Sequence, residues 1–190
     1  MSSTPEILII PPTTTEIEDY AYSSQKHIRE VYIPASVRRI GTDAFFNCSG
    51  LRKVTIAAPI PIIPTRCFFY CMSLKEVILH LATAVIGDEA FAYCAHLPHL
   101  TLPTNLRTIG TKAFLSCEKL QIDALPSRLK TIGDSAFSWC KSLTLTEIPA
   151  SVRRVGDHAF ADCDHITSLR THFTTRLGQD IYYRHPVAAE

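Results

Sequence analysis

The chain of 190 residues lacks a charge imbalance, a long apolar run and a phosphate-binding loop. Its 19 Lys and Arg residues nearly match its 18 Asp and Glu residues, so the formal net charge is +1. A near-neutral chain has no strong electrostatic attraction to nucleic acid or to an anionic membrane. No stretch approaches the roughly 20 apolar residues that a membrane helix needs, and the 7 glycines are isolated rather than clustered. We therefore expect neither nucleic-acid binding nor membrane insertion.

The N-terminus also lacks the features of a secretory signal. The apolar run 7–10 is very short, no basic residue precedes it, and Pro11 and Pro12 end it. These features predict a cytoplasmic protein. Apolar residues make up 46% of the chain, which is ample for a buried core at this length.

What the chain has in abundance is repetition at a spacing of 23 residues. Six cysteines follow one another at that spacing: Cys48, Cys71, Cys94, Cys117, Cys140 and Cys163. The same spacing aligns an aromatic residue in seven copies: Tyr22, Phe45, Phe68, Phe91, Phe114, Phe137 and Phe160. It also aligns an aliphatic residue in each copy: Ile17, Ile40, Ile63, Ile86, Ile109, Ile132 and Val155. Several independent columns in register indicate a repeat protein whose copies stack on one another.

Each copy divides into two parts with different local patterns. Glycine commonly follows the aliphatic position, as Gly41 follows Ile40, which suggests a close backbone approach. Asp or Thr comes next, and this predicts the N-cap of a short helical turn that carries the aromatic residue. The segment 51–56 instead ends in alternation and predicts a short strand with one buried face. Stacked at about 4.8 Å, seven such strands would form a parallel sheet some 30 Å long.

Two copies depart from the strand pattern. In the fifth and sixth copies the inner apolar residue moves one position earlier, to Ile122 and Leu145, while Asp123 and Thr146 occupy the usual position. The spacing to the next cysteine is unchanged. We therefore expect a local bulge or twist rather than a lost repeat.

One long phrase returns almost intact and carries a family resemblance. The segment 33–48 reads IPASVRRIGTDAFFNC, and the segment 148–163 reads IPASVRRVGDHAFADC. Over roughly residues 7 to 171 the chain resembles the BspA-like (Treponema pallidum-type) leucine-rich repeat family. The resemblance implies an α/β repeat solenoid, a right-handed superhelix with one short parallel strand and one short helical turn per 23-residue repeat.

The same resemblance implies a domain organisation and a possible function. We expect a single domain over residues 1–190, with a degenerate N-terminal capping repeat (1–30), six regular repeats (31–168) and a C-terminal cap with a loose tail (169–190). The cap is expected to fold over the last repeat and shield its edge. Family members include bacterial surface adhesins, so a cell-surface or secreted adhesin is the alternative function.

Seven cysteines and eight histidines raise the alternatives of metal binding, disulfides and thiol catalysis. Six cysteines share one repeat position, and Cys67 replaces an alanine at another, so all seven are explained as small buried groups. No Cys-x-x-Cys pair occurs, and the histidines are scattered. His158 lies beside Asp157, but no nucleophile occupies an equivalent accessible position. We therefore predict no catalytic residue, no metal site and no cofactor.

The outward strand positions form the expected binding surface, because a solenoid presents one extended regular face. The candidate residues on this face are Tyr32, Thr55, Ile78, Thr101, Glu147, Lys53, Glu76 and His99. A second candidate is a basic edge formed by Arg107, Lys130 and Arg153. The alternative interpretation is strand propensity for the apolar residues and solubility for the charged ones. These surfaces predict a monomeric, non-catalytic scaffold that binds an unidentified protein.

Overall fold

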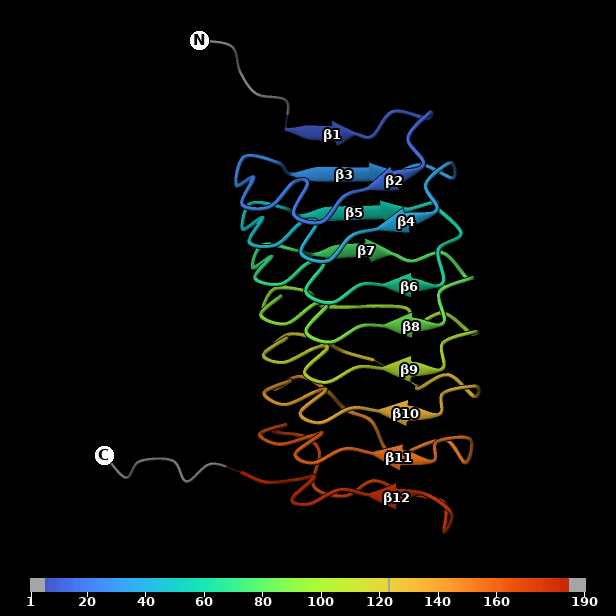
Figure 1. Ribbon diagram of the computed structural model, residues 1–190. Helices are drawn as coiled ribbons and strands as arrows, with labels where there is room; N and C mark the ends of the chain where they lie inside the picture. Colours follow the sequence, from blue (N-terminus) through green and yellow to red (C-terminus); the bar gives the residue numbers. More distant parts are fainter. Residues whose placement is uncertain (1–5, 123, 185–190) are drawn as a thin grey trace, which may run out of the picture.

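The computed structural model describes residues 6–122 and 124–184. The chain is a parallel β-solenoid of about seven turns, which are called coils below (Figure 1). Each coil passes through a long-strand face, a short-strand ladder and a side made of tight turns. The predicted stacking of 23-residue copies is confirmed by strand pairs that lie 23 positions apart, such as Val31 with Val54.

The long-strand face is the parallel sheet that the sequence predicts. It consists of β1 (Ile7–Ile9), β3 (Glu30–Ile33), β5 (Lys53–Ile56) and β7 (Glu76–Ile78), paired in that order. Val31, Val54 and Val77 point inward and are buried, while the residues on either side of them in each strand point outward. This alternation is the reason that the segments form strands with one wet face.

The short-strand ladder is a second set of parallel strands that the sequence did not predict. It consists of β2 (Glu16–Ile17), β4 (Arg39–Ile40), β6 (Ile62–Ile63), β8 (Val85–Ile86), β9 (Thr108–Ile109), β10 (Thr131–Ile132), β11 (Arg154–Val155) and β12 (Arg176–Leu177). The aliphatic column supplies the inward residue of the strands β2 to β11, from Ile17 to Val155, whereas both residues of β12 are exposed. Two-residue strands are too short to leave an alternating pattern in the sequence.

The predicted helical turn is wrong: no helix occurs in residues 6–122 and 124–184. The segment contains paired residues with positive φ, such as Asp43 (57°) and Asn47 (54°). Backbone amides alternate in direction there, because the Phe45 amide donates to Cys67 in the next coil (2.9 Å) while the Phe46 amide donates to Asp43 (3.0 Å). In a helix, every hydrogen bond donated by a backbone amide would stay within the segment itself. The chain is therefore a β-solenoid rather than an α/β one.

Hydrogen bonds between coils explain why turns replace the helix. A residue in the left-handed region costs about 1–2 kcal/mol, and each inter-coil hydrogen bond contributes about 0.5–1.5 kcal/mol. The expected N-cap carboxylates also bond between coils. The Asp19 and Asp88 carboxylates accept hydrogen bonds from the Thr42 and Thr111 amides of the following coils, at 2.9 and 2.8 Å.

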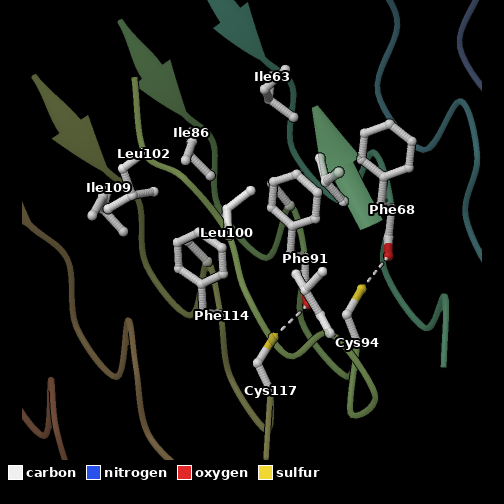
Figure 2. Close-up of a cluster of buried hydrophobic side chains, with 14 of the residues drawn as sticks. Ile63, Phe68, Ile86, Phe91, Cys94, Leu100, Leu102, Ile109, Phe114 and Cys117 are labelled. Carbon is white, nitrogen blue, oxygen red and sulfur yellow. Dashed lines mark hydrogen bonds between the residues drawn. The ribbon is translucent and has the colours of Figure 1, made fainter. Parts of the chain in front are cut away.

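The close approach inferred from glycine is confirmed. A Cβ atom on Gly41 would lie 2.4 Å from the Asp19 amide nitrogen, so no side chain fits there. The aromatic column lies behind this contact. Phe45 and Phe68 stack with ring centroids 5.4 Å apart, and Figure 2 shows Phe68, Phe91 and Phe114 in one buried cluster with Ile63 and Ile86. The column therefore forms one continuous buried core along the described coils.

The first irregularity falls on the long-strand face after β7. Within the described residues, that side retains only isolated parallel bridges, His99 with Gln121 and Glu147 with Arg170. Ile122 and Leu145 are buried and fill the core position, although they stand where other copies expose a residue. The repeats are retained, as expected, but the regular strands are lost. Asp123 lies outside the described residues.

The second irregularity falls between β4 and β6, which are not paired in the described structure. In other coils the amides at two ladder positions donate to the preceding coil, as Ala84 donates to Pro61 and Gly87 to Ile63, both at 2.8 Å. In the β6 coil these two positions are Pro61 and Pro64, which have no N–H. Figure 1 shows a gap between β4 and β6 that the other short strands lack.

Residues 169–184 cover the last repeat as one further coil rather than as a segment folded across it. Strand β12 pairs in parallel with β11, and the Phe160 amide donates to Ile181 at 2.9 Å. At the other end, Tyr22 stacks on Phe45 with centroids 5.3 Å apart, so the first copy joins the aromatic column. Residues 1–5 and 185–190 lie outside the described residues, including the tail that we expected to be loose.

Candidate protein-binding surfaces

All seven cysteines are buried and free of disulfides. The Cys94 and Cys117 thiols donate to the carbonyl oxygens of Phe68 and Phe91 in the preceding coils, at 3.3 and 3.1 Å (Figure 2). Burial raises the pKa of the Cys117 thiol to about 12 and that of Cys48 to about 11. The reactive thiolate is therefore disfavoured, and the thiols serve packing.

No group of three or more His, Cys, Asp or Glu side chains in residues 6–122 and 124–184 is arranged to hold a metal ion. The same part of the chain contains no membrane-spanning helix.

Three predicted residues form a row across the long-strand face. Tyr32 in β3 lies beside Thr55 in β5, which lies beside Ile78 in β7. Tyr32 and Ile78 are 43% and 46% exposed. The structure adds Ile9 of β1, which is 69% exposed and pairs with Tyr32. We call Ile9, Tyr32, Thr55 and Ile78 the apolar row.

The sequence analysis missed Ile9 although the same spacing identifies it. Ile9 stands 23 positions before Tyr32. The predicted residues Lys53 and Glu76 lie in the adjacent row, where the Lys53 ammonium is 3.0 Å from the Glu76 carboxylate. Exposed pairs of this kind contribute about 0–1 kcal/mol. Their main effect here is a polar border beside the apolar row.

The other predicted face residues are not part of this surface. His99 and Thr101 are exposed but follow the last regular strand of the face, β7. Glu147 lies still further along, where its carboxylate pairs with Arg170 at 3.0 Å. The structure therefore brings together Tyr32, Thr55 and Ile78, but separates them from Glu147.

Arg107, Lys130 and Arg153 do lie in adjacent coils, as the sequence predicts. The Lys130 amide donates to the Arg107 carbonyl and the Arg153 amide to the Lys130 carbonyl, both at 2.8 Å. All three side chains are exposed. We call them the basic row. Within the described part of the chain, no carboxylate lies within ion-pair distance of any of them.

Two further surface features were not predicted. A cluster of partly exposed aromatic residues lies on the turn side, where Phe46 stacks on Phe69 (5.3 Å) and Tyr70 contacts Tyr93 (5.3 Å). Their signal was an aromatic residue one or two positions after the core aromatic, as in Phe45-Phe46 and Phe91-Ala92-Tyr93. The second feature is a hollow of about 330 Å³ at the gap between β4 and β6.

Three solved structures are similar to this chain. A leucine-rich repeat protein from Bacteroides ovatus is 31% identical with a TM-score of 0.80, over 90% of this chain and 47% of that one. A leucine-rich cell surface protein from Faecalibacterium prausnitzii is 28% identical with a TM-score of 0.78, over 90% and 48%. The Treponema pallidum leucine-rich repeat protein is 22% identical with a TM-score of 0.74, over 90% and 86%, and shows the fold alone.

The chain thus spans about half the length of the first two structures. The curated proteins include no match to its sequence. The profile of the BspA type leucine-rich repeat region matches residues 2–121 and 61–187, in six copies. Together with the glycine, cysteine and aromatic columns, this match shows that the chain belongs to the BspA-type leucine-rich repeat family.

Proposed function

We propose that this protein is a non-catalytic, monomeric scaffold that binds another protein through its long-strand face. The observation that supports the proposal is the apolar row. Ile9, Tyr32 and Ile78 are exposed side by side on paired strands, where solvent-facing positions are usually polar. Aromatic and large aliphatic side chains are favoured at the centres of protein interfaces.

The apolar row is large enough to form the centre of a protein interface but too small to form the whole of it. Four strands at about 4.8 Å span roughly 14 Å, whereas one partner in a standard interface contributes about 800 Å². The row would therefore form the centre of a larger contact, with Glu30, Lys53 and Glu76 at its border. Because the backbone beneath is hydrogen-bonded on both sides of β3 and β5, little conformational entropy is lost on binding.

The proposal is tested by crosslinking and mass spectrometry in the native cell. Photo-crosslinkers are placed at position 55 on the long-strand face and, for comparison, at position 131 on the short-strand ladder. Partners should be captured at position 55 and be lost in Tyr32→Ala and Ile78→Asp variants. Phe173→Asp is the matched control, because Phe173 is an exposed apolar side chain (91%) on the last coil. If all variants retain the same partners with unchanged melting temperatures, the proposed surface is wrong.

A second candidate function is a cell-surface or secreted adhesin module. It is favoured by the similarity to the Faecalibacterium prausnitzii cell surface protein, which is about twice as long as the aligned region. Cell fractionation separates the two candidates. The scaffold proposal expects the native protein in the cytoplasmic fraction, and the adhesin proposal expects it at the surface or in the medium, where added protease would cleave it.

A further inference from the structure

We propose that the basic row of Arg107, Lys130 and Arg153 is a second docking surface, which binds an acidic, extended segment of a partner protein. The inference rests on the proposed scaffold function and names a class of partner for a different face. Backbone hydrogen bonds place the three cations in three successive coils. At a coil spacing of about 4.8 Å these like charges repel one another, so an anion that spans them is favoured.

Among the described residues, the acidic side chains nearby form no ion pair with the row. The Asp134 and Asp157 carboxylates accept hydrogen bonds from the Asp157 and Gln179 amides of the following coils, at 3.1 and 2.8 Å. Asp134 also pairs with Arg154 at 3.3 Å, one residue beyond the basic row. Both carboxylates therefore bond to groups outside the basic row.

Two other cations, one on the ladder and one on the long-strand face, show what a compensated position looks like. Arg39 occupies the β4 strand and bonds to both Glu16 and Asp19 of the preceding coil. Lys53 on the long-strand face pairs with Glu76. The basic row differs from these positions in having three successive cations and no carboxylate partner in the described structure. This difference is the observation that carries the proposal.

The dimensions of the row fit a short peptide. Three coils span about 10 Å, which is the length of roughly three residues of extended chain. The adjacent ladder positions in β9 and β10 are Thr108 and Thr131, whose hydroxyl groups are donors for carboxylates.

Nucleic acid is a poorer fit to the same surface. Its affinity comes from contacts to many phosphates, commonly 6–10, and single strands also need aromatic platforms. The row offers three cations beside threonines, on a chain of net charge +1. An acidic peptide is therefore the occupant that the geometry favours.

The test is fluorescence anisotropy with a labelled octaglutamate peptide, and with octaglutamine as the uncharged probe. The full chain should bind octaglutamate and not octaglutamine, with affinity that falls toward an ionic strength of about 0.15 M. The Arg107→Gln, Lys130→Gln, Arg153→Gln triple variant should bind about tenfold more weakly, as the loss of three exposed ion pairs predicts.

The matched control is a triple variant with the same loss of charge at lysines that are not stacked in successive coils: Lys26→Gln, Lys112→Gln and Lys119→Gln. All three side chains are exposed. If this control weakens octaglutamate binding as much as the basic-row variant does, overall charge is responsible and the proposal is wrong. The absence of octaglutamate binding to the full chain would also overturn it. Tighter, row-dependent binding of oligothymidylate would replace the peptide with a nucleic acid.

The outcome is independent of the apolar row. Tyr32→Ala and Ile78→Asp should leave octaglutamate binding unchanged, because these residues lie on the long-strand face. Conversely, the basic-row variant should keep the partners captured at position 55. Failure of this inference can therefore be distinguished from failure of the scaffold proposal.

Discussion

The N-terminal and C-terminal halves of the solenoid share one core but are regular on opposite sides. Through β7, the long-strand face is a continuous parallel sheet while the short-strand ladder is interrupted between β4 and β6. From residue 99 onward, the long-strand side has only isolated bridges within the described residues, while β8 to β12 form an unbroken ladder. The aromatic column runs through both halves with centroid spacings of 5.3–5.6 Å.

The comparison shows that the core maintains the repeat while the outer layers vary. Two prolines interrupt one side, and a one-residue shift of an apolar side chain disrupts the other, yet neither change displaces the column. The candidate surfaces follow the regular side of each half. The apolar row lies on the regular strands of the first half, and the basic row lies beside the regular ladder of the second.

The largest effect is expected from removing a ring of the shared column. Phe68→Ala and Phe137→Ala, one in each half, should each lower the free energy of unfolding by about 3–5 kcal/mol through lost burial and a cavity. Both rings are fully buried between two neighbours. Denaturant unfolding measures the values. A loss below about 1 kcal/mol for either variant would contradict the burial of that ring in the shared column.

A smaller loss is expected from the ion pair that joins the coils of β4 and β6 on the turn side, next to the interrupted ladder. The Arg66 guanidinium bonds to both carboxylate oxygens of Asp43, at 2.9 and 2.8 Å, across the coils of β4 and β6. Asp43 is only 1% exposed. Arg66→Gln leaves this carboxylate buried without its cation, and because Arg66 itself is 40% exposed we expect a loss of about 2–3 kcal/mol rather than more.

The control for that substitution lies in the other half. Arg154→Gln removes an ion pair with Asp134 in which both side chains are well exposed, and it should change the unfolding free energy by less than about 1 kcal/mol. Urea unfolding of the two variants side by side makes the comparison. Equal effects would contradict the bridging role of Asp43 and Arg66.

The thiol column is expected to make both halves sensitive to alkali. The Cys117 thiol has its pKa raised from about 9 to about 12 in the fold, so the folded chain keeps a proton that the unfolded chain releases. Its contribution to stability is therefore complete below pH 9 and is lost as the pH rises toward 12. Between pH 9 and 12 the loss is about 1.4 kcal/mol per pH unit.

The measurement is the difference in unfolding free energy between the natural chain and Cys117→Ala at pH 8 and pH 10. The difference should fall by about 1.4 kcal/mol at the higher pH, and subtraction cancels the tyrosines and lysines that ionise in the same range. Cys48→Ala, at the N-terminal end of the column, should behave alike, with its loss complete at about pH 11. A constant difference would mean that these thiols reach solvent.

Much of the fold is predictable because the repeat itself identifies buried positions. A residue type held at one position in seven copies, such as the aromatic column, is restricted by its own neighbours one coil away. The turn side was mispredicted because its conformation also depends on the neighbouring coil. Its geometry is decided by hydrogen bonds such as that from the Phe45 amide to Cys67, and local propensity contains no information about a partner 22 positions later.

The sequence predicted which residues of the candidate surfaces lie in adjacent coils, but not which charged groups pair with one another. Spacing placed Tyr32 beside Thr55, and Arg107 in the coil before Lys130, as the structure shows. The sequence could not show that the Asp134 carboxylate turns toward an amide and an arginine outside the basic row. Side-chain direction depends on the strand and turn geometry of the neighbouring coil, and this geometry was the part mispredicted.

The smallest effect is expected from restoring the missing ladder donor in the first half. Pro64→Gly supplies an N–H at the position where Gly87 donates to Ile63, and it removes the ring from a position that is glycine in most other coils. One new hydrogen bond contributes about 0.5–1.5 kcal/mol, while the loss of proline stiffness costs about 0.4–1 kcal/mol. The unfolding free energy should therefore hardly change, and hydrogen exchange is the informative measurement.

Pro59→Gly is the control, because Pro59 is exposed and lies outside the short-strand ladder. The new amide at position 64 should exchange much more slowly than that at position 59. Equal exchange rates would show that the gap between β4 and β6 has another cause than the absent donors.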